Sequence, residues 1–339
     1  MLFGQTKDKV KNKPRNFWLI LFISCLILLI GIYFSLIYGV KSFSFQELLI
    51  ALKSSQPSKI RTILVDVRLP RIVAAILVGT ALSLSGSIMQ AVTRNPIADP
   101  GLLGINAGAA LALAIAYTIW PQLHYSLIIV ISMVGSTLAC LLVFGLSYQK
   151  GRGYQQMRLI LSGAMVAMLL SAIGQALINY FHLATAIIGW QAGGLVGVNW
   201  KMVTMVGPVI ILALIILQVF AYQLSILSLA EEKAKSLGQS TFTLTLLFLA
   251  LVLVLSSTSV SLAGNIAFVG LIVPHLTKAF IPHNYKQSLP IIGILGAAFI
   301  VWVDLLCRVI NPPYETPITA VVSLLGFPVL LWLVRKAEN

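Results

Sequence analysis

The sequence predicts an all-α membrane protein with about ten transmembrane helices, and three observations support this fold class. Only 9% of the 339 residues are charged, whereas a soluble domain carries about 25%. The mean hydropathy is +0.97. The apolar residues form long continuous runs, and a helix that spans a bilayer needs about 20 such residues. Helices are favoured because lipid requires every backbone hydrogen bond to be made within the protein.

Ten apolar segments follow one another along the chain and make up one transmembrane domain, residues 17–334. A basic tail, residues 1–16, precedes the first segment, which is too long for the apolar core of a signal peptide and is therefore a retained helix. Residues 335–339 form a short C-terminal tail. The predicted spans are 17–40, 72–91, 103–119, 124–146, 159–179, 202–221, 242–262, 266–281, 289–306 and 317–334.

The distribution of positive charge predicts the orientation of these helices. Ten spans and a cytoplasmic N-terminus place both termini in the cytoplasm, and most of the 23 Lys and Arg residues then lie on that side. The net charge of +14 is therefore attributed to topology and lipid headgroups rather than to nucleic acid. Six other cations form a basic patch on the outer face, open to an anionic partner: Lys41, Lys53, Lys59, Arg61, Arg68 and Arg71.

The sequence contains few motifs for energy coupling or catalysis. The Gly-x-x-x-x-Gly-Lys-Ser/Thr motif is absent, so an ATPase would have to be a separate chain. The four histidines and three cysteines lack metal-binding or disulfide spacing. Asp304 lies near the end of the ninth span, four residues before Arg308, which predicts a local ion pair near the outer interface rather than a proton relay. An ion-coupled carrier and a membrane-embedded enzyme stay open as alternatives.

Three segments carry further structural signals. The segment 93–104 contains two prolines and two glycines, and broken backbone at membrane depth must be buried in protein or line a cavity. We therefore expect a gate there. The polar stretch 222–240 predicts one or two short helices on the cytoplasmic surface. In the second span, small residues at every fourth position predict a ridge that packs against another helix: Ala75, Gly79, Ser83 and Ser87.

Five motifs, in their order along the chain, resemble the FecCD family of importer permeases, which includes the iron-siderophore, haem and cobalamin permeases. The motifs are Arg68-Leu-Pro-Arg71, Gly86-Ser-Ile-Met-Gln-Ala91, Asn95-Pro-Ile-Ala-Asp-Pro-Gly-Leu-Leu-Gly104, the loop Leu229–Gly238, and Gly264-Asn-Ile-Ala-Phe-Val-Gly-Leu-Ile-Val-Pro-His275. The sequence departs from the family pattern at Lys278, where arginine is usual, and in Glu315-Thr-Pro-Ile-Thr319. The resemblance covers most of the chain and implies the type II ABC importer permease fold.

The resemblance also implies partners. Two permeases, identical or related, would assemble with two cytoplasmic ATPases and one extracytoplasmic substrate-binding protein. ATP and Mg²⁺ would bind to the ATPase, and we expect no cofactor, metal site or catalytic residue in this chain. The chain would be a transport subunit in a bacterial cytoplasmic membrane. The implied substrate is an iron(III)-siderophore, with the hydroxamate type as first candidate and haem or cobalamin as alternatives, moved by alternating access.

Three groups of residues receive roles from the resemblance. The arginines that would meet glutamates of the binding protein are Arg68, Arg71 and Arg308. The residues that would couple the permease to the ATPase lie in the 222–240 loop: Glu231, Ala234, Leu237 and Gly238. The residues that would close the cytoplasmic end of the pathway are Asn95, Ile97, Gln155, Gln156 and Met157.

Overall fold

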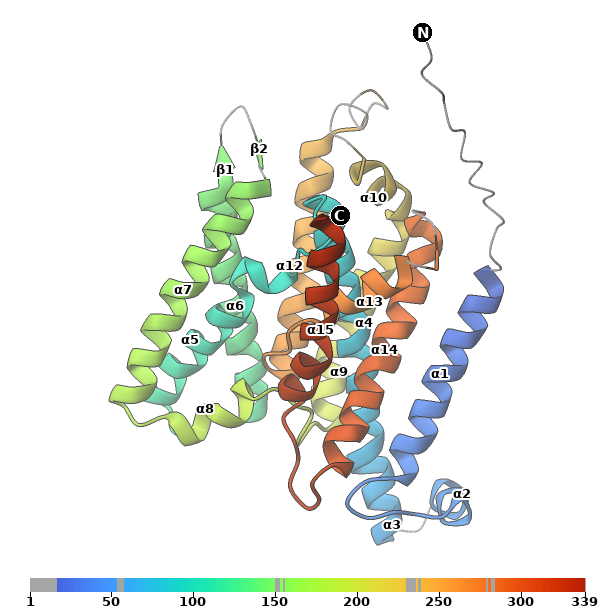
Figure 1. Cartoon of the computed structure of the whole chain (residues 1–339). Helices are drawn as coiled ribbons and strands as arrows, with labels where there is room; N and C mark the ends of the chain where they lie inside the picture. Colours follow the sequence, from blue (N-terminus) through green and yellow to red (C-terminus); the bar gives the residue numbers. More distant parts are fainter. Residues whose placement is uncertain are drawn as a thin grey trace.

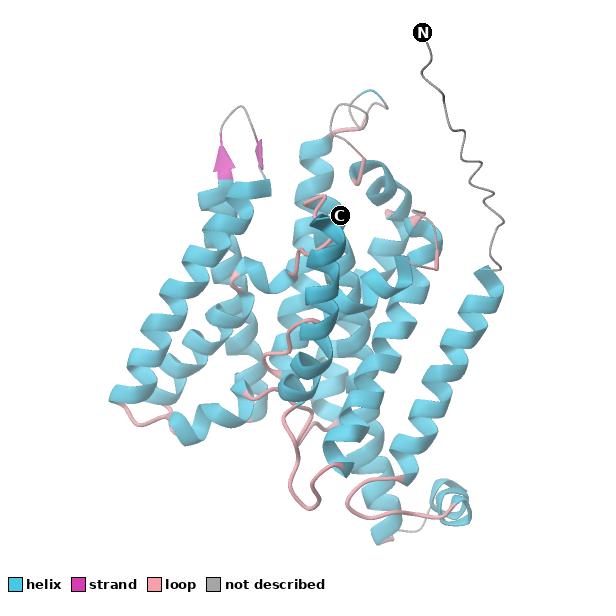
Figure 2. Cartoon of the chain, in the orientation of Figure 1, coloured by secondary structure: helices cyan, strands magenta, loops and turns pink. Residues whose placement is uncertain are grey.

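The chain folds into a bundle of helices with one small β-hairpin, shown in a computed structural model (Figures 1 and 2). The structure describes residues 17–53, 58–149, 153–154, 156–229, 236, 239–278, 280–281 and 284–338. Within these ranges the two strands, β1 (Tyr148–Gln149) and β2 (Gly153–Tyr154), pair antiparallel and extend the end of one helix. The predicted all-α class is therefore confirmed for the described residues.

Each of the ten apolar segments contains a helix. These helices are α1 (Phe17–Ile37), α4 (Leu69–Val92), α5 (Ile105–Ile119), α6 (Tyr125–Ser147), α7 (Gln156–Tyr180), α9 (Trp200–Val219), α12 (Thr241–Ala263), α13 (Val269–Lys278), α14 (Tyr285–Val309) and α15 (Ile318–Glu338). Shorter elements connect them: α2 (Phe45–Lys53), α3 (Lys59–Arg61), the π-helix η1 (Thr62–Arg68), the 3₁₀-helix η2 (Pro100–Leu103), α8 (Ala184–Gln191) and α10 (Ala221–Leu227).

Seven helices of the described part are long and apolar enough to cross a membrane. Two further apolar helices, Ile105–Ile119 and Ile318–Leu331, are shorter. The helix α13 has 10 residues, and at 1.5 Å per residue it covers about 15 Å, half of a hydrocarbon core of about 30 Å. The exact count of ten crossing helices therefore stays a prediction.

The second predicted span begins well before residue 72. Helices α3, η1 and α4 form one continuous helical stretch from Lys59 to Val92. Its outer end is covered by apolar side chains from the preceding segment, where Phe43, Leu48 and Ala51 pack with Leu64 into a small separate core. Arg68 and Arg71 are consequently helical residues rather than loop residues.

Helix α4 occupies the centre of the bundle and packs against α12, α13 and α14. In its most apolar window 83% of the residues are buried, compared with 22% for α1 and for α7. The predicted small-residue ridge is confirmed, because a Cβ atom on Gly79 would lie 2.2 Å from the carbonyl oxygen of Gly296 on α14. The hydroxyl of Ser83 on the same ridge donates to the carbonyl oxygen of Ile292, 3.1 Å away.

The connecting elements gather at the two ends of the bundle. The β1–β2 hairpin, α10 and the C-terminus lie at one end, and α2, α3 and α8 lie at the other (Figure 1). This segregation agrees with the alternation expected from the sequence, in which the first group would be cytoplasmic and the second extracytoplasmic. Helix α1 lies at the edge of the bundle beside α14.

Candidate functional site

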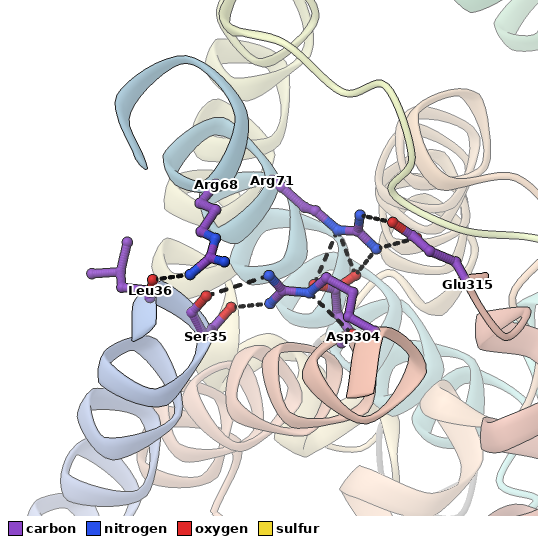
Figure 3. Close-up of polar contacts among 7 residues, drawn as sticks. Ser35, Leu36, Arg68, Arg71, Asp304 and Glu315 are labelled. Atoms are coloured by element: carbon purple, nitrogen blue, oxygen red, sulfur yellow. Dashed lines mark hydrogen bonds and ion pairs between the residues drawn. The ribbon is translucent and has the colours of Figure 1, made fainter. Parts of the chain in front are cut away.

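The three arginines of the sequence prediction come together at the outer end of α4 and α14. Arg68 ends the π-helix η1, Arg71 lies in the first turn of α4, and Arg308 lies in the last turn of α14. Figure 3 shows Arg71 between Asp304 of α14 and Glu315 of the loop after α14, whereas Arg68 points away from Asp304 toward the end of α1. We name these five residues the outer ion cluster.

Arg71 is the most heavily bonded member of the outer ion cluster. Its Nε donates to Asp304 Oδ1 at 2.9 Å, and its Nη2 lies 2.8 Å from the same oxygen. Its two Nη atoms donate to the two carboxylate oxygens of Glu315, both at 2.7 Å. Such a bidentate, charge-assisted contact fixes both distance and orientation.

Arg308 joins the ninth predicted span to the first. Its Nε lies 3.2 Å from Asp304 Oδ2, so the i, i+4 ion pair expected from the sequence is confirmed. Its Nη1 donates to the backbone oxygen of Ser35 at 3.3 Å, and its Nη2 donates to the Ser35 hydroxyl. The outer end of α1 is thereby tied to α14.

Arg68 differs from the other two arginines. The ion pairs found among the described residues link Arg71 and Arg308 to carboxylates and leave Arg68 without one. Its guanidinium instead donates to the backbone oxygens of Leu36 and Lys41 and lies 4.8 Å from the ring centroid of Phe43. Three guanidinium groups thus share two carboxylates, which leaves the outer ion cluster with one excess positive charge.

Burial of this cluster was not expected from the sequence. Arg68, Arg71 and Arg308 are 6%, 7% and 5% exposed, whereas the predicted basic patch placed Arg68 and Arg71 on the surface. Burial is tolerated because Asp304 and Glu315 neutralise two of the three charges and backbone carbonyls solvate the third. The patch itself remains, because Lys41, Lys53 and Lys59 are exposed.

The sequence analysis assigned no role to Glu315, a member of the cluster, or to Ser35, which bonds to Arg308. A usable signal existed for Glu315, because the chain has only nine Asp and Glu residues and this one follows the ninth span on the basic outer side. Burial raises the pKa of Glu315, but its hydrogen bonds to Arg71 and the arginine charge outweigh that effect and hold the pKa below its usual range. Glu315 is therefore ionised at neutral pH.

The interrupted segment 93–104 is confirmed as non-helical apart from η2. Arg94 adopts a left-handed backbone with φ of 49°, and the Asn95 side chain accepts a hydrogen bond from the Ile97 backbone nitrogen at 3.1 Å. Ile97 is 45% exposed and Met157, at the start of α7, is 74% exposed. Gln155 and the side chain of Gln156 lie outside the described residues, so closure of a pathway by these five residues stays a prediction.

A second interruption, residues 264–268, separates α12 from α13. Gly264 has φ of 71°, and a Cβ atom there would lie 2.2 Å from the carbonyl oxygen of Trp190. The Asn106 side chain, just after the first interruption, donates to Asn265 Oδ1 at 2.6 Å. Asn265 also accepts from the Thr319 hydroxyl of α15 through its backbone oxygen. The start of α5, directly after the first interruption, is therefore bonded to the second interruption.

A cavity of about 520 Å³ opens beside the second interruption and the outer ion cluster. Its walls come from α4, α5, α6, α8, α9, the end of α12 and the loop before α15, and they include Arg71, Glu315, Tyr117 and Trp190. Membrane transporters commonly form their substrate pathway from interrupted helices that line a cavity, and this part of the fold has both features.

The predicted coupling residues Glu231, Ala234, Leu237 and Gly238 lie outside the described residues. The helix that leads into their loop, α10, packs against α4, α12 and α14. Arg94 Nε donates to the backbone oxygen of Leu227 at 3.4 Å, so α10 contacts the interrupted segment. Lys278, which departs from the family pattern, donates to the side chain of Gln90 at 2.8 Å.

A multi-pass helical bundle with interrupted helices beside a cavity and charged groups at its outer end is the architecture of a transport permease. The chain belongs to the FecCD transport family, whose profile matches residues 27–336. Membership and the seven apolar helices make it a multi-pass protein of a bacterial inner membrane.

Individual relatives agree with this assignment. The chain is 34% identical to the iron(3+)-hydroxamate import system permease protein FhuB of Bacillus subtilis, over 92% of this chain and 82% of that protein. It is 35% identical to the Fe(3+)-citrate import system permease protein YfmD of the same organism, over 97% and 98% of the two chains. A solved metal-chelate type ABC transporter in an inward-facing conformation matches with a TM-score of 0.82 and 29% identity, covering 94% and 99%.

Proposed function

We propose that this chain is the membrane-spanning permease subunit of an ATP-binding-cassette importer for an iron(III) chelate. The observation that carries the proposal is similarity along almost the whole chain to permeases named for ferric hydroxamate and ferric citrate import, together with the fold match to a metal-chelate transporter. The ferric hydroxamate class is the first candidate for the substrate. Haem is the second, because a heme-iron permease of Staphylococcus aureus is 30% identical over 97% of this chain.

The proposed mechanism is alternating access driven by a partner ATPase. ATP and Mg²⁺ bind to that partner, and the permease makes and breaks no covalent bond. The interrupted segments 93–104 and 264–268 are the parts that would move, because their backbone lacks the continuous hydrogen bonding of a helix. Asn106 and Asn265 would couple the two movements.

A pull-down tests the importer class. The protein is solubilised from its native membrane in mild detergent, and its partners are identified by mass spectrometry. Recovery of a P-loop ATPase, a second permease subunit and a substrate-binding protein supports the proposal. Intact permease recovered repeatedly without an ATPase would instead favour an ion-coupled carrier. Uptake of ⁵⁵Fe-labelled hydroxamate siderophore, ferric citrate and haem then separates the substrate classes.

Docking of a binding protein is proposed at the outer ion cluster. Its excess positive charge is centred on Arg68, which has no carboxylate partner among the described residues. Reversal of this charge in Arg68→Glu should weaken docking of the co-purified binding protein at least tenfold, as expected for loss of a charge-assisted contact and gain of repulsion. Lys201→Glu, an exposed cation on α9, provides the control, and equal effects of both variants would contradict a specific site at Arg68.

Coupling to the ATPase is proposed through the loop that contains Glu231 and Leu237. Replacing both residues by alanine should leave basal ATP hydrolysis intact and abolish both uptake and its dependence on the loaded binding protein. Rates of hydrolysis and uptake are measured in the same proteoliposomes. Normal uptake and normal stimulation in the double variant would remove this loop from the coupling path.

A further inference from the structure

We propose that Glu315 is an exchangeable internal counter-ion: it occupies on Arg71 the position that a carboxylate of the docking protein takes, and it leaves when that protein binds. The inference rests on docking at the outer ion cluster, as proposed above, and concerns how the site is held before the partner arrives. The two carboxylates of the cluster, Asp304 and Glu315, would thus have different roles. They differ in burial, in the number of arginines that they contact, and in whether they belong to a helix or a loop.

Asp304 has the properties of a permanent counter-ion. Its side chain is 1% exposed, it lies within α14, and it contacts both Arg71 and Arg308. Glu315 has the opposite properties. Its side chain is 29% exposed, it belongs to the loop between α14 and α15, and Arg71 is its partner in the ion pairs of the described residues. Release of Glu315 therefore leaves Arg71 still paired with Asp304, whereas release of Asp304 would disturb two arginines.

The geometry of Arg71 makes Glu315 and an incoming carboxylate of the docking protein mutually exclusive. A guanidinium group offers one edge formed by its two Nη atoms for a parallel, two-bond contact with a carboxylate. Glu315 fills this edge with two bonds of 2.7 Å, and Asp304 contacts the adjacent edge formed by Nε and Nη2. An incoming carboxylate can bind Arg71 in the same bidentate way only after Glu315 has left. Arg68, in contrast, has no carboxylate to exchange among the described residues, because its guanidinium donates to backbone oxygens.

The surroundings of Glu315 allow it to leave. Both Glu315 and Arg71 line the cavity of about 520 Å³, so a released side chain has open space beside it. The following residues are anchored, because Thr316 donates from its backbone nitrogen to Cys307 at 3.1 Å and Ile318 donates in the same way to Gly193 at 3.3 Å. The exchange would therefore act on a loop that is fixed directly after Glu315 and leads into α15.

The test compares Glu315→Gln with a matched control, Glu47→Gln. Both variants remove one negative charge on the outer side. Glu47 is exposed and bonds to Ser44 at the start of α2, and the ion pairs of the described residues give it no arginine partner. The first measurement is the rate at which phenylglyoxal modifies Arg71 in the purified complex, followed by mass spectrometry. We expect Arg71 to react several-fold faster in Glu315→Gln and at the wild-type rate in Glu47→Gln.

The second measurement is the affinity of the co-purified binding protein for the complex in lipid nanodiscs. Removal of the competitor should tighten docking about fivefold in Glu315→Gln and change it little in Glu47→Gln. Unchanged Arg71 reactivity, or unchanged or weaker docking by Glu315→Gln while Arg68→Glu still weakens it, would overturn the exchange and leave the docking site intact. Insensitivity of docking to Arg68→Glu would refute the docking site, and the exchange with it.

Discussion

Replacing Gly79 by alanine tests the packing of α4 against α14 at the centre of the bundle. A Cβ atom at this position would lie 2.2 Å from the carbonyl oxygen of Gly296 and 2.7 Å from its carbonyl carbon. Both neighbours are backbone atoms, so no side chain can rotate away, and the two helices would have to separate. Overpacking of this kind costs about 1–3 kcal/mol, while alanine gains up to about 1 kcal/mol over glycine in a helix.

The matched control is Gly145→Ala on α6. Gly145 is exposed, and a Cβ atom there would meet nothing within 4 Å. This variant makes the same chemical change and should show only the gain from helix propensity. The difference in stability between the two variants therefore isolates the clash, and we expect it to be about 1–3 kcal/mol in favour of Gly145→Ala.

Equilibrium unfolding of both variants in mixed micelles of increasing SDS content, followed by circular dichroism, measures this difference. Transport activity at a temperature where both variants are folded provides a second readout. Coincident unfolding curves for Gly79→Ala and Gly145→Ala would refute the close approach of α4 and α14 and would place the small-residue ridge of α4 elsewhere in the fold.

Two further predictions concern the outer ion cluster. Asp304→Asn leaves Arg308 without its carboxylate partner in a buried site and should destabilise the protein by about 3–5 kcal/mol. The control Glu47→Gln should stay within about 0.5 kcal/mol of wild type. Equal stabilities of the two variants would show that water reaches the cluster and that its charges are not buried. The pKa of Glu315 is held below its usual range, so its pairing with Arg71 should stabilise the protein fully above about pH 4.3, the ordinary Glu value. This stabilisation should be lost as the pH falls through the lower pKa of the folded state. The melting temperature should therefore fall less on acidification in Glu315→Gln than in wild type, and equal falls in both proteins would contradict the prediction.

Hydropathy predicted the helices because a membrane span has to be continuously apolar. All ten predicted segments contain a helix, and the broken segment 93–104 was visible from its prolines and glycines. The same signal failed at the start of α4, where the helix continues outward to Lys59. Residues 59–71 are too polar to register as a span, and they are helical because Leu64 packs into a local core with Phe43 and Leu48. The mean hydropathy of a local window does not report such packing between separate segments.

The outer ion cluster shows where local patterns stop being informative. The Asp304–Arg308 pair was predictable, because its members are one helical turn apart. The Arg71–Glu315 contact joins residues 244 positions apart, and no periodicity links them. Counting charges along the sequence placed Arg71 on an exposed patch, since the method assigns a side of the membrane but cannot recognise that a distant carboxylate allows burial.

The composition of the outer ion cluster itself argues for a role beyond stability. A buried ion pair often stabilises a protein no more than apolar residues of similar volume would, and this site holds three arginines with two carboxylates. The third charge weakens the site as a stabilising element, because within the described part of the chain Arg68 contacts backbone oxygens and the ring of Phe43 and has no counter-ion. The same excess charge is useful if an anionic group of another protein arrives from outside. The cluster has one carboxylate fewer than it has arginines, and one of its carboxylates, Glu315, lies on a partly exposed loop. It is therefore suited to receive a carboxylate from a partner protein, and variants of Arg68 and Glu315 test the two features independently.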